Sequence, residues 1–276
     1  MKKFKEKIHI SSIFMISGII ICCLPLVFDF ITNRKQQSLI RSYEYEIEEK
    51  TDIDLEAELE MAHKYNEILF KTNGILVGNN EYTQVMGNYE NILNISGSGM
   101  MGVVQIPNIN VDLPIYHGTD DKVLSNAVGH VEYSSFPVGG ENTRALISAH
   151  RGSPTAKLFT RLDELKQGDL FFIKICGEKL AYEINDITVI KPEDMDKLDI
   201  VPNEDLVSLI TCTPYGVNTH RLIVTGHRVP YVEQEENEIK PNMLSFRETL
   251  FILIPMIFVF LFIKKQFKKS NLERRS

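Results

Sequence analysis

Two apolar segments, one near each end, constrain the fold of this chain more than any other feature. The first runs from Ile8 to Phe28, directly after the basic tract Met1–Lys7. Its length is close to the roughly 20 residues that a helix needs to cross a bilayer. The second runs from Leu250 to Ile263 and is shorter than the roughly 17 residues usually required. The sequence therefore predicts one membrane span clearly and a second that needs its flanking residues to be long enough.

The flanks of the two segments indicate an orientation. A cleaved signal peptide has a shorter apolar core and a small-residue cleavage site, whereas here Pro25 and Phe28 follow the core, as in an uncleaved anchor. The tail after Ile263 is strongly basic, which favours a membrane span over a buried or interfacial helix. Because basic tracts tend to stay in the cytoplasm, we predict a membrane protein with two spans, both termini cytoplasmic and about residues 32–245 outside.

Charge and cysteine content narrow the class of the central part. The net charge is −7 and acidic residues fill Glu44–Glu60, so a nucleic-acid partner is not expected. Of the four cysteines, only Cys176 and Cys212 lie outside the apolar segments, which is too few for a disulfide-built scaffold. A single Cys176–Cys212 disulfide is the structural alternative to a reactive thiol.

Hydrophobic spacing divides the central part into helical and strand-rich regions. Apolar residues recur every three or four positions in 36–70, with a break at Thr51-Asp52, which predicts one or two amphipathic helices. Short β-rich runs then alternate with turns, which predicts a small β-barrel or sandwich with few helices, one of them at Ala156–Leu165. The predicted parts are 1–31 (basic tail and first span), 32–72 (helical), 73–100 (loop), 101–232 (strand-rich body), 233–249 (linker), 250–263 (second span) and 264–276 (basic tail).

Three residue types suited to acyl transfer stand at strand ends. His150 ends one predicted strand, Cys212 ends another, and Arg221 begins a third. A neighbouring imidazole can activate a thiol, and an arginine can donate hydrogen bonds to an oxygen that gains charge. A zinc site built from Cys212 and nearby histidines is the alternative, but no close pair has zinc-like spacing.

The sequence around these residues resembles the sortase family, in particular its class C, pilus-assembling group. The similarity covers about residues 100–230 in order. It is carried by the following stretches: Met101–Pro107, Leu113–Gly118, Phe136–Gly140, Ser148–Gly152, Lys157–Phe159 and Thr211–Leu222. Class C members often carry a second, C-terminal span, which matches the two apolar segments.

The resemblance implies an eight-stranded sortase barrel over 101–232 and a cysteine transpeptidase without a metal or cofactor. His150, Cys212 and Arg221 match the catalytic residues of the family. The implied substrates are pilin or surface proteins with an LPXTG-like sorting signal, cleaved between Thr and Gly and transferred to a pilin lysine. We also expect substrate contacts from Thr211, whose hydroxyl can orient Cys212 or the substrate, and from His220, which shapes the entrance.

One departure from the family concerns the loop at 73–100. Class C sortases usually cover the active site there with an Asp-Pro-aromatic motif, and this loop contains no proline. Either no lid is present, or another residue such as Tyr82 or Met86 takes its place. Two other functions stay open: a sortase that anchors surface proteins to a peptidoglycan precursor, and a non-catalytic membrane-tethered scaffold for pilus subunits.

Overall fold

The computed structural model describes residues 2–72, 87–153, 156–194 and 198–273, and it separates the chain into two compact units. One unit contains residues 1–30 and 243–276, and the other runs from Ile31 to Asn242. The predicted lid residues Tyr82 and Met86 lie outside the described residues.

The first unit contains two long apolar helices. They are the N-terminal part of α1 (Lys2–Glu48) and α6 (Phe246–Glu273). α6 starts earlier than the apolar run because Ser245 and Glu248 form a capping box: the Ser245 hydroxyl accepts from the Glu248 amide, and the Glu248 carboxylate accepts from the Ser245 amide. Within Phe246–Lys264, α6 contains an 18-residue window with a mean hydropathy of 2.2. Both helices are long and apolar enough to cross a membrane.

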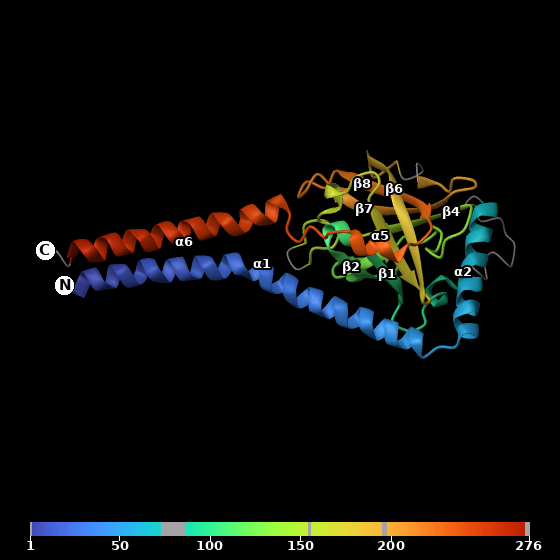
Figure 1. Cartoon of the computed structure of the whole chain (residues 1–276), viewed down its shortest axis with the longest axis horizontal. Helices are drawn as coiled ribbons and strands as arrows, with labels where there is room; N and C mark the ends of the chain where they lie inside the picture. Colours follow the sequence, from blue (N-terminus) through green and yellow to red (C-terminus); the bar gives the residue numbers. More distant parts are fainter. Residues whose placement is uncertain (1, 73–86, 154–155, 195–197, 274–276) are drawn as a thin grey trace. The chain divides into compact units, whose positions relative to one another are not determined.

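The second unit is built around a closed barrel of eight strands, as predicted (Figure 1). The strand order around the barrel is β1-β2-β3-β4-β7-β8-β6-β5. The strands are β1 (Met100–Ile106), β2 (Val111–His117), β3 (Val128–His130), β4 (Thr143–Ser148), β5 (Leu170–Ile175), β6 (Glu178–Ile190), β7 (Asp205–Thr213) and β8 (His220–Val229). β4 and β7 are parallel, whereas β7 and β8 are antiparallel.

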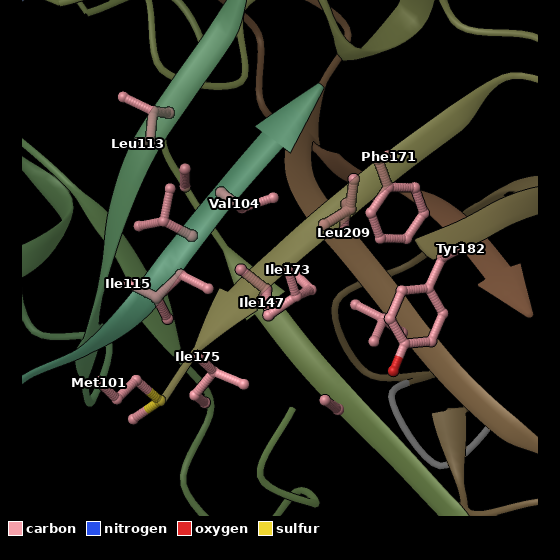
Figure 2. Close-up of a cluster of buried hydrophobic side chains, with 14 of the residues drawn as sticks. Met101, Val104, Leu113, Ile115, Ile147, Phe171, Ile173, Ile175, Tyr182 and Leu209 are labelled. Carbon is pink, nitrogen blue, oxygen red and sulfur yellow. The ribbon is translucent and has the colours of Figure 1, made fainter. Parts of the chain in front are cut away.

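Alternating side chains fill the inside of this barrel. Figure 2 shows side chains pointing toward one another, among them Ile147 of β4, Phe171 of β5 and Leu209 of β7. All three are fully buried. β5 and β6 form a hairpin, and its two turn residues, Cys176 and Gly177, both have positive φ angles. Such a turn matches the twist of the strands that it joins.

Helices attach to the barrel at both ends of this unit. The predicted break at Thr51-Asp52 is present, since α1 ends at Glu48 and α2 runs from Asp52 to Thr72. Asn66 of α2 is buried and exchanges two hydrogen bonds with the backbone of Phe136, at 2.7 and 3.0 Å. After β8, the short helix α5 (Glu233–Glu238) is bound by an ion pair between Glu236 and Lys179 of β6. The other short helical turns are η1 (Tyr89–Asn91), η2 (Pro107–Ile109), α4 (Asp121–Leu124) and η3 (Leu162–Glu164).

The predicted helix at Ala156–Leu165 is wrong. Only η3 is helical there, and Leu158 has a φ of 43°, which a right-handed helix does not allow. Tertiary hydrogen bonds compete with the helical ones: the Phe159 amide donates to the His150 carbonyl, and the Arg161 guanidinium donates to the Ile109 carbonyl. The apolar spacing that suggested a helix is explained by burial of Leu158, Phe159 and Leu162 in the core.

Candidate active site

Two of the three candidate residues are paired across neighbouring strands, and the third follows the end of the next strand. Cys212 of β7 is paired directly with Arg221 of β8. On the other side of β7, the ladder with β4 ends at Ser148 and Ile210, and the Ala149 amide still donates to the Ile210 carbonyl at 3.1 Å. Continued for two residues in the same register, this pairing would bring His150 opposite Cys212. We infer a row of His150, Cys212 and Arg221 about 10 Å long, because adjacent strands lie roughly 4.8 Å apart.

The row lies on the outer face of the barrel. Residues alternate between the two faces of a strand, and the inner positions Leu209 and Thr211 of β7 are buried, with Leu209 part of the main core. Cys212 therefore shares the outer face with Ile210, and Arg221 with Ile223. Ile210 and Ile223 belong to a second cluster of buried apolar residues that also contains Leu146, Ile190 and Leu198. Cys212 and Arg221 thus border a second buried core, and Ile190 of β6 is paired with Arg221 itself.

Each member of the row is half-buried. Cys212 is a free thiol. The Arg221 guanidinium is held near the end of its strand, because it donates to the backbone carbonyls of Asn218 and His220 at 3.3 and 3.2 Å. A thiol, an imidazole and a fixed guanidinium on one face form a set sufficient for nucleophilic attack on a carbonyl, proton transfer and stabilisation of an oxyanion.

Thr211 and His220, the two expected substrate contacts, do not lie on the face of Cys212. Thr211 is 1% exposed, and its hydroxyl donates to the Ala149 carbonyl at 2.8 Å. This bond ties β7 to the segment that leads into His150. His220 is paired with Thr213, and its Nδ1 lies 2.9 Å from the Thr219 hydroxyl. Their roles in substrate binding stay predictions.

Arg151, the residue after His150, forms an ion pair with its own side chain buried. Its guanidinium pairs with the Asp163 carboxylate at 2.5 Å, and only 3% of the Arg151 side chain is exposed. It also donates to the Thr213 hydroxyl at 3.0 Å. The only sequence clue to this arrangement was its position directly after His150.

Cys176 and His130 lie outside the row. Cys176 is a free thiol in the β5–β6 turn, and burial raises its pKa to about 12, so it is a poor nucleophile. His130 is fully buried, and desolvation lowers its pKa to about 4. Over the described residues, no group of three or more His, Cys, Asp or Glu side chains is arranged to hold a metal ion.

Comparison with known proteins agrees with this geometry. A family model described as Sortase domain matches residues 104–229. Sortase D of Bacillus subtilis (strain 168) is 32% identical over 131 residues, which are 46% of this chain and 63% of that protein. Sortase A of Streptococcus agalactiae serotype III (strain NEM316) is 30% identical over 128 residues, 45% of this chain and 51% of that protein. The match thus spans between about half and two thirds of the length of these curated relatives.

Solved structures match over a larger share. The crystal structure of sortase C1 from Streptococcus agalactiae is 42% identical, with a TM-score of 0.66, and the match covers 71% of this chain and 100% of that one. Sortase C from Clostridium perfringens with the C-terminal cell wall sorting motif is 39% identical, with a TM-score of 0.61, covering 70% of this chain and 99% of that one. The eight-stranded barrel of this chain, the family model and the matched structures together show that the chain belongs to the sortase family.

Proposed function

We propose that this chain is a membrane-anchored cysteine transpeptidase that cleaves an LPXTG-like sorting signal between Thr and Gly and transfers the acyl group to a pilin lysine. The observation that carries the proposal is the direct pairing of Cys212 with Arg221, together with the parallel β4–β7 register that leads toward His150 and Cys212. The class C sortases among the matched structures favour pilin polymerisation over other sortase roles.

The proposed reaction has two acyl-transfer steps. The Cys212 thiolate attacks the carbonyl carbon of the substrate threonine, and Arg221 donates hydrogen bonds to the oxyanion of the tetrahedral intermediate. The intermediate collapses, the C–N bond to glycine breaks, and His150 gives a proton to the departing amine. The uncharged ε-amine of a pilin lysine then attacks the thioester, a proton passes to His150, and the thiolate leaves as the isopeptide bond forms.

The test is to trap the acyl-enzyme. The full chain in detergent micelles is incubated with an LPXTG peptide, and the protein is digested and mapped by mass spectrometry. We expect an adduct with the mass of the peptide up to threonine, bound to Cys212. Cys176→Ala is the matched control and should keep the adduct, whereas Cys212→Ala should lose it and all peptide cleavage. An intact peptide, or cleavage that survives in Cys212→Ala, would overturn the proposal.

Anchoring to a peptidoglycan precursor is the second candidate, because the sequence is also 30% identical to a protein named sortase A. The two functions share the thioester and differ in the amine that resolves it. Supplying the acyl-enzyme with a lysine-containing pilin fragment and with a peptidoglycan-bridge amine, in competition, separates them. The proposed function predicts an isopeptide bond to the pilin lysine as the major product. Pilus formation that persists in Cys212→Ala would instead favour the non-catalytic scaffold.

For the membrane we propose two spans, with both basic ends in the cytoplasm and the barrel outside. The support is the length and apolar character of α1 and α6 and the basic residues that flank them. In intact cells, a membrane-impermeant thiol reagent should label a cysteine introduced at the exposed Val217, in a Cys212→Ala background, but not one introduced at Ser276. The reverse labelling pattern would refute this orientation.

A further inference from the structure

Arg151 is a buried charged side chain directly beneath the catalytic row. It follows His150 in the chain, and strand alternation turns it away from the outer face that His150 and Cys212 share. One terminal nitrogen donates to the Thr213 hydroxyl at 3.0 Å, and the other pairs with Asp163 at 2.5 Å. Its guanidinium carbon also lies 6.0 Å from the centre of the Tyr215 ring. Arg151 therefore contacts the residue that follows Cys212 and the loop between β7 and β8.

The backbone around Arg151 is fixed on its other side. The His150 carbonyl accepts from the Phe159 amide at 3.2 Å, and the Gly152 amide donates to the Thr160 hydroxyl at 3.0 Å. The Tyr215 ring packs on Gly152, where an added Cβ would lie only 3.0 Å from it. The segment that carries His150 is thus bound both to the turn at 158–164 and to the loop after Cys212, and Arg151 is the side chain that reaches both.

We propose that Arg151, held by Asp163, is a positioning residue that fixes the ends of β4 and β7 against each other and so sets the approach of His150 to Cys212. β4 and β7 are hydrogen-bonded along their length but are no longer paired by the ladder at His150 and Cys212 themselves. A short rigid connection is needed there, because a displacement of about 1 Å between reacting groups can cost on the order of a hundredfold in rate. The planar guanidinium provides one, since it donates in two fixed directions at once.

The ion pair explains why an arginine can be buried at this place. A buried cation is costly unless it is paired and hydrogen-bonded. Asp163, whose side chain is 35% exposed, neutralises Arg151 and stays in contact with water. The positive charge of Arg151 is therefore compensated where it is buried. The two terminal nitrogens of the guanidinium can then hold the ends of β4 and β7 in place.

Arg161 offers a matched control. It is another arginine with a buried side chain, 4% exposed, and it too pairs with a carboxylate of η3, that of Glu164 at 2.8 Å. It also donates to the carbonyls of Ile109 and Asn242, far in sequence from His150 and Cys212. Replacing either arginine removes a buried ion pair, but replacing Arg151 also removes the bond to Thr213, the neighbour of Cys212.

The experiment compares Arg151→Lys and Arg151→Ala with Arg161→Lys, and adds Thr213→Val and Thr213→Ser, all in the full chain in detergent micelles. Two quantities are measured besides Tm. The first is kcat and KM for the LPXTG peptide. The second is the rate of Cys212 alkylation by iodoacetamide as a function of pH, read by peptide mapping. The inference rests on the proposed function, but the alkylation needs no substrate, so a missing peptide adduct would refute that function while the alkylation profile still tests Arg151.

We expect Arg151→Ala to lower kcat about tenfold to a hundredfold with KM within about twofold. Its alkylation profile should differ from that of the wild type, because Cys212 loses a well-placed imidazole. Arg151→Lys should lower kcat less than Arg151→Ala, since an ammonium group keeps the positive charge but cannot donate from two separate nitrogens. Thr213→Val should change both quantities in the same direction, and Thr213→Ser should not. Arg161→Lys should lower Tm only.

The proposal fails if the Arg151 and Arg161 variants lose stability alike while kcat and the alkylation profile of the folded protein match the wild type. If Arg151→Ala does not fold, Thr213→Val decides, because it leaves the ion pair in place and removes only the bond to β7. A wild-type alkylation profile in Thr213→Val would then overturn the proposal.

Discussion

Two places in the barrel unit bring histidines together with other polar groups, and they are built in opposite ways. In the first, between η1 and strands β2 and β3, the Tyr89 hydroxyl lies 2.9 Å from Nδ1 of His130, and Nε2 of His130 lies 2.8 Å from the Ser135 carbonyl. His117, nearby, has its ring nitrogens 2.9 and 2.8 Å from the carbonyls of Gly99 and Ile92. Every ring nitrogen there has a protein partner, and the ring of Phe136 stacks on His130.

The second place is the row of His150, Cys212 and Arg221. Within the part of the chain that the structure describes, neither the His150 ring nor the Cys212 thiol has a side-chain hydrogen bond, and both are half-buried. We therefore expect His130, with both ring nitrogens bonded and no exposure to water, to contribute to stability. We expect His150, which is half-buried, to be the one available for proton transfer.

The strongest test of this contrast is His150→Asn. We expect kcat for peptide cleavage to fall about a hundredfold to ten-thousandfold, because proton transfer by a positioned side chain contributes on that order. Tm should stay close to the wild-type value, since the ring has no hydrogen bond to lose. Cleavage is followed by chromatography of the released glycine-terminated fragment, and stability by thermal unfolding monitored by circular dichroism.

The matched change at the other site is His130→Phe, which should do the reverse. It keeps an aromatic ring in the stack with Phe136 but leaves the Ser135 carbonyl without its imidazole partner, at a cost of about 1–3 kcal/mol. The Tyr89 hydroxyl keeps its bonds to the carbonyl of residue 130 and to the Gly118 amide. The folded fraction should still cleave the peptide. If His130→Phe abolished cleavage in folded protein, or His150→Asn unfolded the chain, the contrast between the two sites would be broken.

The sequence predicted the row better than its surroundings. Turn residues between apolar runs located the ends of the strands, so Cys212 and Arg221 were correctly expected at the same rim. The buried state of Arg151 could not be predicted, because it depends on a turn whose fold is set by contacts with distant backbone, such as that of Ile109. The same contacts overrode the helical spacing of Ala156–Leu165. Local sequence patterns therefore predict the strands and where they end. The contacts of Arg151 and of the turn at 158–164 join residues that are distant in sequence, so local patterns do not predict them.

The pH dependence of stability sharpens the description of the buried site. Burial lowers the pKa of His130 from its usual 6.5 to about 4 in the folded protein. Between these values the unfolded chain binds a proton that the folded chain does not, so stability rises with pH. The contribution of the neutral His130 to the free energy of unfolding is complete above about pH 6.5 and is lost as the pH falls toward 4. It amounts to about 3 kcal/mol, because each unit of pKa difference between the folded and unfolded states corresponds to 1.36 kcal/mol.

The measurement is urea unfolding of the full chain in detergent micelles between pH 4.5 and 7, for the wild type and for His130→Phe. Carboxylates with lowered pKa values add to the slope in both proteins, so the difference between the two curves isolates His130. We expect the two curves to converge as pH falls. Parallel curves would mean that His130 is protonated in the folded state, contrary to its complete burial.

The smallest expected effect on kcat and stability comes from replacing Thr211. This residue lies next to Cys212 in the chain, but like His130 it is buried and hydrogen-bonded within the protein. Thr211→Val keeps the shape of the side chain and removes the hydrogen bond to the Ala149 carbonyl. We expect a loss of about 1–2 kcal/mol of stability and less than about a tenfold fall in kcat, because the bond supports the segment before His150 without touching the outer face. Thr211→Ser, which keeps the hydroxyl, should retain more of both. If Thr211→Val lowered kcat as far as His150→Asn does, Thr211 would act on the substrate. Groups that take part in the reaction would then lie on both faces of the sheet and not on the outer face alone.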